Sequence, residues 1–535
     1  MNIRWPPATK ALSEPSWTIM ISTALGSRPA ALQIGMTKVR MVFSISASRM
    51  RLMRCAWAAR NGASASSERQ MRMVMRLNTG GTAVEQARNA RRPRQLRSLA
   101  LVGVLLLSAC GRSETDVATE DASNATNPTG RTPNRSGLSG VFRGASFAAV
   151  AADESRAAEI GREILAGGGN AVDAAVAMYF ALAVTLPSAG GLGASGACIV
   201  HNSKTLAAES FVFAPVAAPG AVNGVSFMIP TGVRAMTLMH VRHGQGRWEQ
   251  SVAAAERLAR FGVPVSRALA RDLQAGGALL AADREAQRIF GGALAEGSNL
   301  VQPELAGTLA VIRSRGGVDF FQGTFARTLS DQISQMGGSL PLDALRRAVP
   351  QAGLPVSENF GTFGRQRIYV APPPMAGAAA LAGWRGQAPG GGTPTDSGGF
   401  AGLVAVDNKA NAVACSLSMG QLFGARMVVP GTGILLGAPT PDAASVSPMI
   451  IAYPSNGEFV FAGAGGGAPT AAQATGIVAR ATIEAGQNLA SVLAQRRGQG
   501  GFVNAIACPS GLRGGANTCQ GAVDPAGAGL ALLAN

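Results

Sequence analysis

Cys110 carries the clearest chemical signal in the sequence. It ends the tetrapeptide 107–110, Leu-Ser-Ala-Cys, which is typical of a bacterial lipobox with small residues before the cleavage point. Basic residues at 91–97 precede the apolar stretch 99–107, which is too short to cross a hydrocarbon core of about 30 Å as a helix. This order predicts cleavage before Cys110 and acylation of its thiol. The alternative is a short buried helix with a core cysteine.

The lipobox divides the chain into four parts. Residues 1–90 are expected to be an overextended or disordered leader, 91–109 a signal peptide, 110–137 a disordered polar tether, and 138–535 the folded domain. The expected location is the periplasmic side of the cell envelope, and Gly111 after the cysteine favours the outer membrane.

Most of the chain's positive charge lies in the leader. The formal net charge is +17, but residues 1–109 hold 17 of the 47 Lys and Arg residues and only three acids, Glu14, Glu68 and Glu85. The remaining chain is nearly neutral, so we expect no nucleic-acid partner.

Four further cysteines follow Cys110. Cys198 and Cys415 lie in apolar, strand-like runs and are expected to be buried thiols. Cys508 and Cys519 flank a turn-rich segment near the C-terminus, and in an oxidising compartment they are a candidate disulfide. Two free thiols are the alternative.

Two other patterns are excluded by their context. His240 and His243 have no acid or cysteine beside them, so no zinc site is expected, and no other metal or cofactor is implied. The formal GxGxxG at 191–196 follows a helical segment and precedes a strand, whereas a dinucleotide site needs the strand first.

Hydrophobic periodicity predicts a layered α/β domain. A helix over 151–165 is followed by one over 171–186, opened by Asn170 or Asp173, which is apolar on nearly every face and therefore buried. Further helices are expected at 248–261, 267–279, 305–314, 324–336 and, after the glycines at 463–467, at 470–483. Strands are expected at 197–201, 367–371, 402–407, 412–418, 449–453 and 458–462.

Four groups of segments, in this order, resemble the gamma-glutamyltranspeptidase family over most of 145–485. They are Gly-Gly-Gly-Asn-Ala-Val-Asp-Ala-Ala-Val-Ala at 167–177; residues 260–266 with Phe-Gly-Val-Pro-Val-Ser; Val-Ala-Val-Asp at 404–407 with 411–413 and Phe-Gly at 423–424; and Pro-Gly-Thr-Gly-Ile-Leu-Leu at 430–436 with 446–448 and 463–467. The resemblance implies an N-terminal-nucleophile hydrolase fold, an αββα sandwich, with a large-subunit part over about 138–399 and a small-subunit part over about 400–535.

The resemblance also implies a reaction. A threonine hydroxyl cleaves the peptide bond before it, becomes the first residue of the small subunit, and then attacks a γ-glutamyl carbonyl with its own amine as base. Glutathione is a substrate of this kind. Two glycine N–H groups hold the oxyanion, which on this chain correspond to Gly466 and Gly467.

The nucleophile is missing at its expected place. It stands seven residues before the position of Asp407, which is Phe400, a residue without a hydroxyl. Thr395 and Ser397 are the neighbouring candidates, although an insertion would be needed to use them, and the favoured alternative is that both are solvated loop residues.

Other family positions are kept only in part. Ser418 corresponds to the hydroxyl that supports the nucleophile, Asp442 to the acid that binds the α-amine, and Ser445 to the second of two serines. The first serine is replaced by Ala444, an asparagine by Gly420, and the arginine that binds the α-carboxylate by Phe211.

Two functions from different classes follow. The first is a γ-glutamyl or other amide hydrolase or transferase that uses Thr395 or Ser397 and cleaves itself near 395–400. The second is an uncleaved, inactive lipoprotein that binds a ligand or partner on the same fold. A solute-binding lipoprotein of unrelated fold is disfavoured by the ordered motifs, and the oligomeric state stays open.

Overall fold

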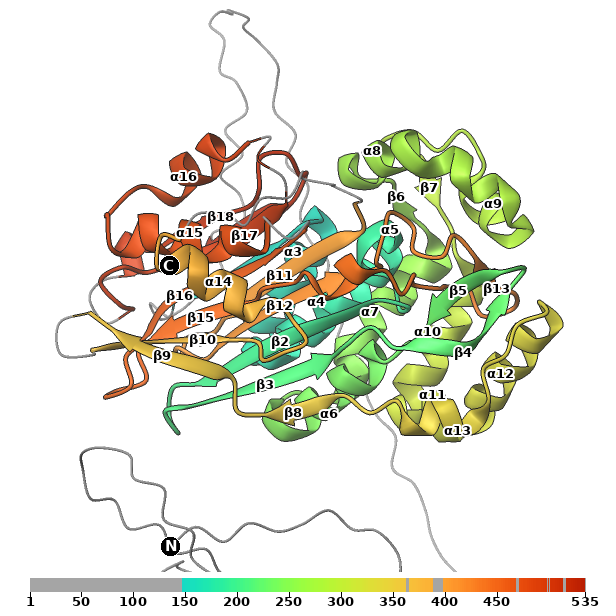
Figure 1. The fold of residues 1–535 in the computed structure, drawn as a ribbon, viewed down its shortest axis with the longest axis horizontal. Coiled ribbons are helices and arrows are strands. Elements are labelled where there is room, and N and C mark those ends of the chain that lie inside the picture. Colours follow the sequence, from blue (N-terminus) through green and yellow to red (C-terminus); the bar gives the residue numbers. More distant parts are fainter. Residues whose placement is uncertain are drawn as a thin grey trace, which may run out of the picture. The chain divides into compact units, whose positions relative to one another are not determined.

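Two antiparallel sheets lie face to face, and helices cover their outer faces (Figure 1). The computed structural model describes residues 147–361, 365–387, 398–467, 471–497, 499, 501–512 and 516–534. The seven-stranded sheet has the order β19-β1-β11-β12-β2-β3-β8, and the six-stranded sheet the order β18-β17-β16-β15-β10-β9. The αββα sandwich predicted from the sequence is confirmed.

The strands of the larger sheet are β1 (Ala148–Ala152), β2 (Ser195–Asn202), β3 (Ala207–Phe213), β8 (Gln351–Gly353), β11 (Phe400–Val406), β12 (Ala412–Ser418) and β19 (Leu530–Ala534). Those of the smaller sheet are β9 (Val356–Phe360), β10 (Gln366–Val370), β15 (Met449–Ala452), β16 (Phe459–Gly466), β17 (Phe502–Ala507) and β18 (Gln520–Ala522). Three short pairs are β4 (Ala217–Val222) with β5 (Val225–Met228), β6 (Val263–Pro264) with β7 (Asn299–Leu300), and β13 (Val428–Val429) with β14 (Ile434–Leu435).

Two groups of helices complete the layers. The outer face of the larger sheet shares its core with α3 (Ser155–Ala166), α4 (Ala171–Thr185), α5 (Pro187–Gly190), α6 (Gly232–His243), α7 (Trp248–Phe261), α8 (Arg267–Gly276), η1 (Gly277–Ala282), α9 (Arg284–Phe290), α10 (Pro303–Arg315), α11 (Gly317–Gln322), α12 (Thr324–Gln335) and α13 (Leu342–Arg347). The smaller sheet packs against α14 (Gly377–Trp384), α15 (Ala474–Ile483) and α16 (Leu489–Gln495). Short 3-10 turns are η3 (Pro441–Ala444), η4 (Ala471–Gln473) and η5 (Ala516–Thr518).

Helix α4 is the centre of the helical layer against the larger sheet. All of its residues are buried, as its uniformly apolar sequence predicts. Asn170 accepts hydrogen bonds from the amides of Val172 and Asp173, and Asp173 accepts one from the amide of Asn170, which forms a capping box. The Gly-Asn-Ala-Val-Asp motif therefore starts a buried helix.

Two boundaries differ from the sequence prediction. The helix expected over 151–165 begins only at Ser155, because Ala148–Ala152 form β1 between β11 and β19. The strand expected to end at residue 462 continues through the glycines as far as Gly466 in β16. Pairing with neighbouring strands overrides local periodicity at both places.

Both pairs of folded-domain cysteines are disulfides. Cys198 on β2 lies directly opposite Cys415 on β12, their Cα atoms are 4.0 Å apart, and their sulfurs are joined. The expectation of two separate buried thiols is wrong, because a strand register brings together residues that are 217 positions apart in sequence. Cys508 and Cys519 are joined as well, over a separation of 11.

We expect the Cys198–Cys415 disulfide to stabilise the fold more than Cys508–Cys519. In the chain-entropy model, separations of 217 and 11 residues correspond to about 5 and about 3 kcal/mol of unfolding free energy. Urea unfolding of C198A/C415A, with C508A/C519A as the matched control, measures the difference. Equal losses, or free thiols at 198 and 415 in non-reduced peptide maps, would contradict it.

Candidate active site

Phe400 is the first residue of β11 and lies at one end of the sandwich. It pairs directly with Ser418 on β12, and Ser418 pairs with Ser195 on β2, so that the three residues form one row across the sheet. The half-buried ring of Phe400 packs on the core between the two sheets. A Cβ atom built on Gly466 of β16 would lie 3.4 Å from this ring. A hydrocarbon ring thus occupies the place where the family resemblance puts a hydroxyl.

Hydroxyl groups beside Phe400 are held by the backbone. Ser418 is fully buried, and its Oγ accepts a hydrogen bond from the amide of Gly420 at 2.9 Å. The Oγ of Ser195 lies 3.2 Å from the carbonyl oxygen of Ala443, which ties β2 to η3. Both side chains therefore brace the walls of the site.

The glycine pair lies on the opposite sheet. Gly466 ends β16, and a Cβ on it would also meet the Phe502 ring at 3.1 Å. The amide of Gly467 donates to the carbonyl oxygen of Ser445 at 3.1 Å. Because this N–H group already has a partner, the two glycines do not present two free donors in this conformation.

Asp442 and Ser445 lie on and just after η3, near the glycine pair. Both side chains are half-buried, and the amide of Ser445 donates to the backbone carbonyl of Asp442 at 2.8 Å. Within the described residues the Asp442 carboxylate has no ion-pair partner, unlike Asp272, which pairs with Arg271. Asp442 can therefore accept an ammonium group.

The backbone conformation at Gly420 excludes the asparagine side chain that the family resemblance implies there. Gly420, at the position of the asparagine, has φ +84°, and a Cβ there would lie 1.9 Å from the carbonyl oxygen of Ala438. Its own carbonyl accepts a hydrogen bond from Thr440 at 2.6 Å. No side chain fits at position 420 in this conformation.

Phe211, at the position of the arginine in the family resemblance, does not lie near Phe400. It is fully buried in the core between the larger sheet and its helices, with its ring 5.8 Å from that of His243, whereas Phe400 belongs to the core between the sheets. An arginine at position 211 would enter the helix-side core on this backbone. The structure does not bring this position to Phe400.

The structure thus brings Ser418, Asp442, Ser445, Gly466 and Gly467 together around Phe400, and each role implied for them stays a prediction. Thr395, Ser397 and the lipidation candidate Cys110 lie outside the described residues.

Asp407, another motif residue, joins the sheet to α4. The carboxylate is 3% exposed and accepts hydrogen bonds from the Ala171 amide at 3.2 Å, the Lys409 amide at 2.9 Å, and both the amide and the side chain of Asn411 at 3.0 and 2.8 Å. Ala171 is the first residue of α4. The acid at this motif position therefore has a structural role.

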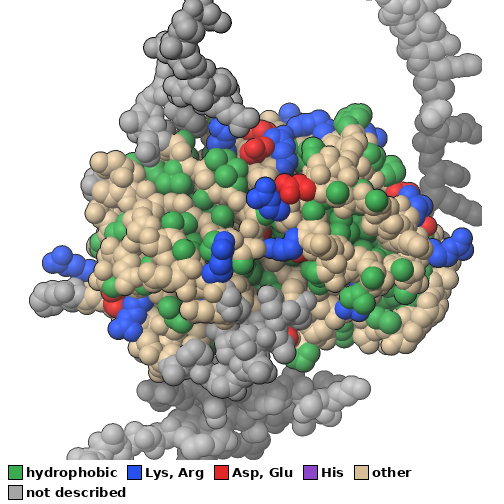
Figure 2. Space-filling model, turned by 90° about the horizontal axis from the view of Figure 1, so that it is seen from above, with side chains coloured by type: hydrophobic (Ala, Val, Ile, Leu, Met, Phe, Trp, Pro, Cys, Tyr) green, Lys and Arg blue, Asp and Glu red, His purple; other side chains and the backbone are tan. Residues whose placement is uncertain are grey.

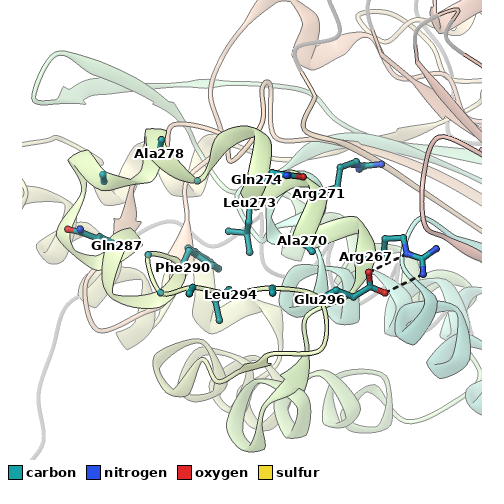
Figure 3. A pocket seen from close by; sticks show the side chains of 16 residues that line it. Arg267, Ala270, Arg271, Leu273, Gln274, Ala278, Gln287, Phe290, Leu294 and Glu296 are labelled. Carbon is teal, nitrogen blue, oxygen red and sulfur yellow. Dashed lines mark hydrogen bonds and ion pairs between the residues drawn. The ribbon is translucent and has the colours of Figure 1, made fainter.

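A cavity of about 810 Å³ lies between α8, η1 and α9 (Figure 3). Leu273, Phe290 and Leu294 line it, and an ion pair between Arg267 and Glu296 spans one end at 3.3 Å. Its walls come from helices and the loop after α9 instead of β11 or β12. The cavity is therefore separate from the Phe400 site.

The surface carries charges of both signs. On the face drawn in Figure 2, acidic side chains lie beside basic ones. Ion pairs in the structure include Arg288–Glu304 at 2.7 Å and Arg313–Glu256 at 2.6 Å. Among the described residues, no cluster of three or more metal-ligating side chains is found, and no helix has the length and apolarity of a membrane span.

The layer order and the strand that opens at Phe400 define an N-terminal-nucleophile hydrolase fold. Cephalosporin acylase from Bacillus halodurans has the same fold, with a TM-score of 0.59 over 72% of this chain and 96% of that chain. The two sequences are 20% identical, so this likeness concerns the fold alone.

Sequence similarity identifies the family within this fold. Residues 157–386 match the family model for gamma-glutamyltranspeptidase. The glutathione hydrolase proenzyme of Escherichia coli (strain K12) is 32% identical over 249 residues, which are 43% of this chain and 42% of that protein. The proenzyme of Bacillus subtilis (strain 168) is 31% identical over 254 residues, 43% of each. Over this part, the chain is similar to the gamma-glutamyltranspeptidase family.

The sequence similarity to known proteins covers only part of this chain and part of its relatives, and this limits what it says about function. The chain spans less than half the length of these two relatives. The family-model match ends at residue 386, before β11 begins at Phe400. Of the elements around the candidate site, β2 lies inside the match, whereas β11, β12, η3 and β16 lie beyond it.

We expect Asp407→Ala to destabilise the protein by about 3 kcal/mol, because several buried amides lose their acceptor. Asp442→Ala is the matched control at another family-motif acid and should change stability by less than about 0.5 kcal/mol. Urea unfolding measures both. Equal stability of the two variants would show that Asp407 does not hold α4.

Proposed function

We propose that this protein is a catalytically inactive gamma-glutamyltranspeptidase homologue that binds a small ammonium-bearing ligand at the cell envelope. Phe400 is the observation that carries the proposal. It heads the strand where the family resemblance places the nucleophile, and a phenyl ring has no atom that can attack a carbonyl.

The residues around Phe400 favour a protein without catalytic activity over one in which the nucleophile has moved to Thr395 or Ser397. Gly420 leaves no room for a side chain, and the Gly467 amide is bonded to Ser445. Displacement of a nucleophile by about 1 Å costs on the order of 100-fold in rate, so a hydroxyl several residues away is a poor substitute. Asp442 is half-buried and has no ion-pair partner among the residues that the structure describes, which supports an ammonium group as part of the ligand.

A γ-glutamyl hydrolase that uses Thr395 or Ser397 is the second candidate. The similarity to glutathione hydrolase proenzymes favours it. The family would then supply the substrate class, γ-glutamyl compounds such as glutathione.

Purified protein is expected to release no p-nitroaniline from γ-glutamyl-p-nitroanilide above the rate without protein, because position 400 has no hydroxyl. The T395A/S397A variant is the matched control and should give the same background. Turnover by the wild-type protein that disappears in T395A/S397A would establish the second candidate.

We also propose that the protein is anchored by lipid at Cys110 on the periplasmic side of the envelope. The lipobox and the polar tether after it support the anchor. Two disulfides in the folded domain support an oxidising compartment.

In a bacterial host, the wild-type protein should partition into the detergent phase of a Triton X-114 extraction, because an acyl chain at Cys110 binds membranes. C110A should remain in the aqueous phase or keep its leader, and C55A, a cysteine in the leader, is the control that should behave as wild type. Detergent partition of cleaved C110A would refute the anchor.

A further inference from the structure

The last segment of the chain, residues 520–534, spans the edges of both sheets. Its first part forms β18 beside β17 in the smaller sheet, and its last part forms β19 beside β1 in the larger sheet. The connection between them passes Asp153 and Glu154 at the end of β1, where Ala528 forms a bridge with Glu154. We call residues 520–534 the C-terminal clasp.

The clasp meets the site end of the sandwich through a chain of hydrogen bonds. The Gly402 amide on β11 donates to the Asp153 carboxylate at 2.6 Å. Asn504 on β17 donates to the Gly402 carbonyl at 3.2 Å and accepts from the Asp524 amide of the clasp at 3.2 Å. Both sheets and the clasp are therefore joined two residues from Phe400.

Two arginines hold the turn of the clasp from outside. Arg271 of α8 donates to the Ala526 carbonyl at 2.8 Å, and Arg497 after α16 donates to the Pro525 carbonyl at 3.1 Å. Gly529 lies so close to β1 that a Cβ on it would be 2.3 Å from the Ala152 carbonyl oxygen. The clasp is fitted tightly against β1.

Two carboxyl groups lie where the clasp contacts β1: Asp153 directly follows β1, and Asp524 belongs to the clasp. Asp153 is 8% exposed. The charged groups that face the pair are Arg271 from α8 and Arg496 from the end of α16, and Arg271 is also bonded to Asp272. Glu154, beside Asp153, is engaged with the Ala157 amide at the start of α3.

We propose that the C-terminal clasp is pH-responsive: it is closed while the carboxyl group of Asp153 is protonated, and it loosens when Asp153 ionises. Ionisation creates a buried charge at the contact and repulsion between Asp153 and Asp524, which lie on opposite sides of it. Loosening frees the edges of β1 and β17 beside Gly402.

Burial raises the pKa of Asp153 from 3.8 to about 7, against the hydrogen bonds from Asn504 and Gly402. Burial also raises the pKa of Asp524. Because the closed form holds its proton more tightly than the open form, closure weakens as the pH rises from about 4 to about 7 and levels off above that. With a pKa of 3.8 in the open form and about 7 in the closed form, the closing constant falls by up to about 30-fold between pH 5.5 and 8.0.

Hydrogen–deuterium exchange of the full folded protein tests this proposal. After correction for intrinsic exchange rates, opening of peptides from 520–534 should increase by up to about 30-fold from pH 5.5 to 8.0 in the wild type. Asp153→Asn removes the principal titrating group, so opening of its clasp should change far less between the two pH values than in the wild type. Asp319→Asn, at an acid on α11, is the control that should keep the wild-type response.

Asp524→Asn provides a second variant that keeps Asp153, and a weaker pH response is expected because the like charge is gone. Peptides from α4 report on global unfolding, which also exposes Asp153, so α4 should open much less often than the clasp at both pH values. A pH-independent clasp in the wild type, an unchanged response in Asp153→Asn, or a clasp that opens no more often than α4 would overturn the proposal.

Discussion

The Asp407 carboxylate is the interaction on which the arrangement of the molecule depends. It accepts hydrogen bonds from the turn between β11 and β12 and also from Ala171, the first residue of α4, 236 positions away in sequence. Through this one side chain, the strand that opens the candidate site is fixed to the buried helix at the centre of its helical layer. A buried carboxylate with several amide donors is costly to remove, so this motif position serves the fold independently of catalysis.

The fold of this family depends on many contacts spread over the chain, whereas its reaction depends on a single hydroxyl group. The fold is held by three separate cores, by two sheets in register and by two disulfides, none of which needs a hydroxyl group at position 400. The family's reaction needs one hydroxyl at one place, and Phe400 stands where the family resemblance puts that hydroxyl. The same ring fits the core between the sheets, where it is compatible with the packing around Gly466. A family fold without the family's reaction is consistent with these two observations.

Sequence patterns predicted much of the fold and less of the site. The uniformly apolar run of α4 and the helix over 248–261 were predictable because their signals are local. The strands β1 and β19 and the Cys198–Cys415 disulfide were not, because their stability comes from neighbours far away in sequence. The cluster of Asp153, Asn504 and Asp524 was also missed. Its only sequence signal was an acid at the end of an apolar run. The burial that raises the pKa of Asp153, and the nearby Asp524 carboxylate, depend on the tertiary fold and not on neighbouring residues in sequence.

The state of the peptide bond between residues 399 and 400 tests the central claim most directly. Intact-mass spectrometry of the purified, denatured protein, before and after prolonged incubation, measures it without an assumed substrate. If Phe400 has replaced the nucleophile, the folded domain is recovered as one uncleaved chain at both times. Two fragments divided between residues 394 and 400 would contradict this claim, since self-cleavage there requires a nucleophile that Phe400 does not provide.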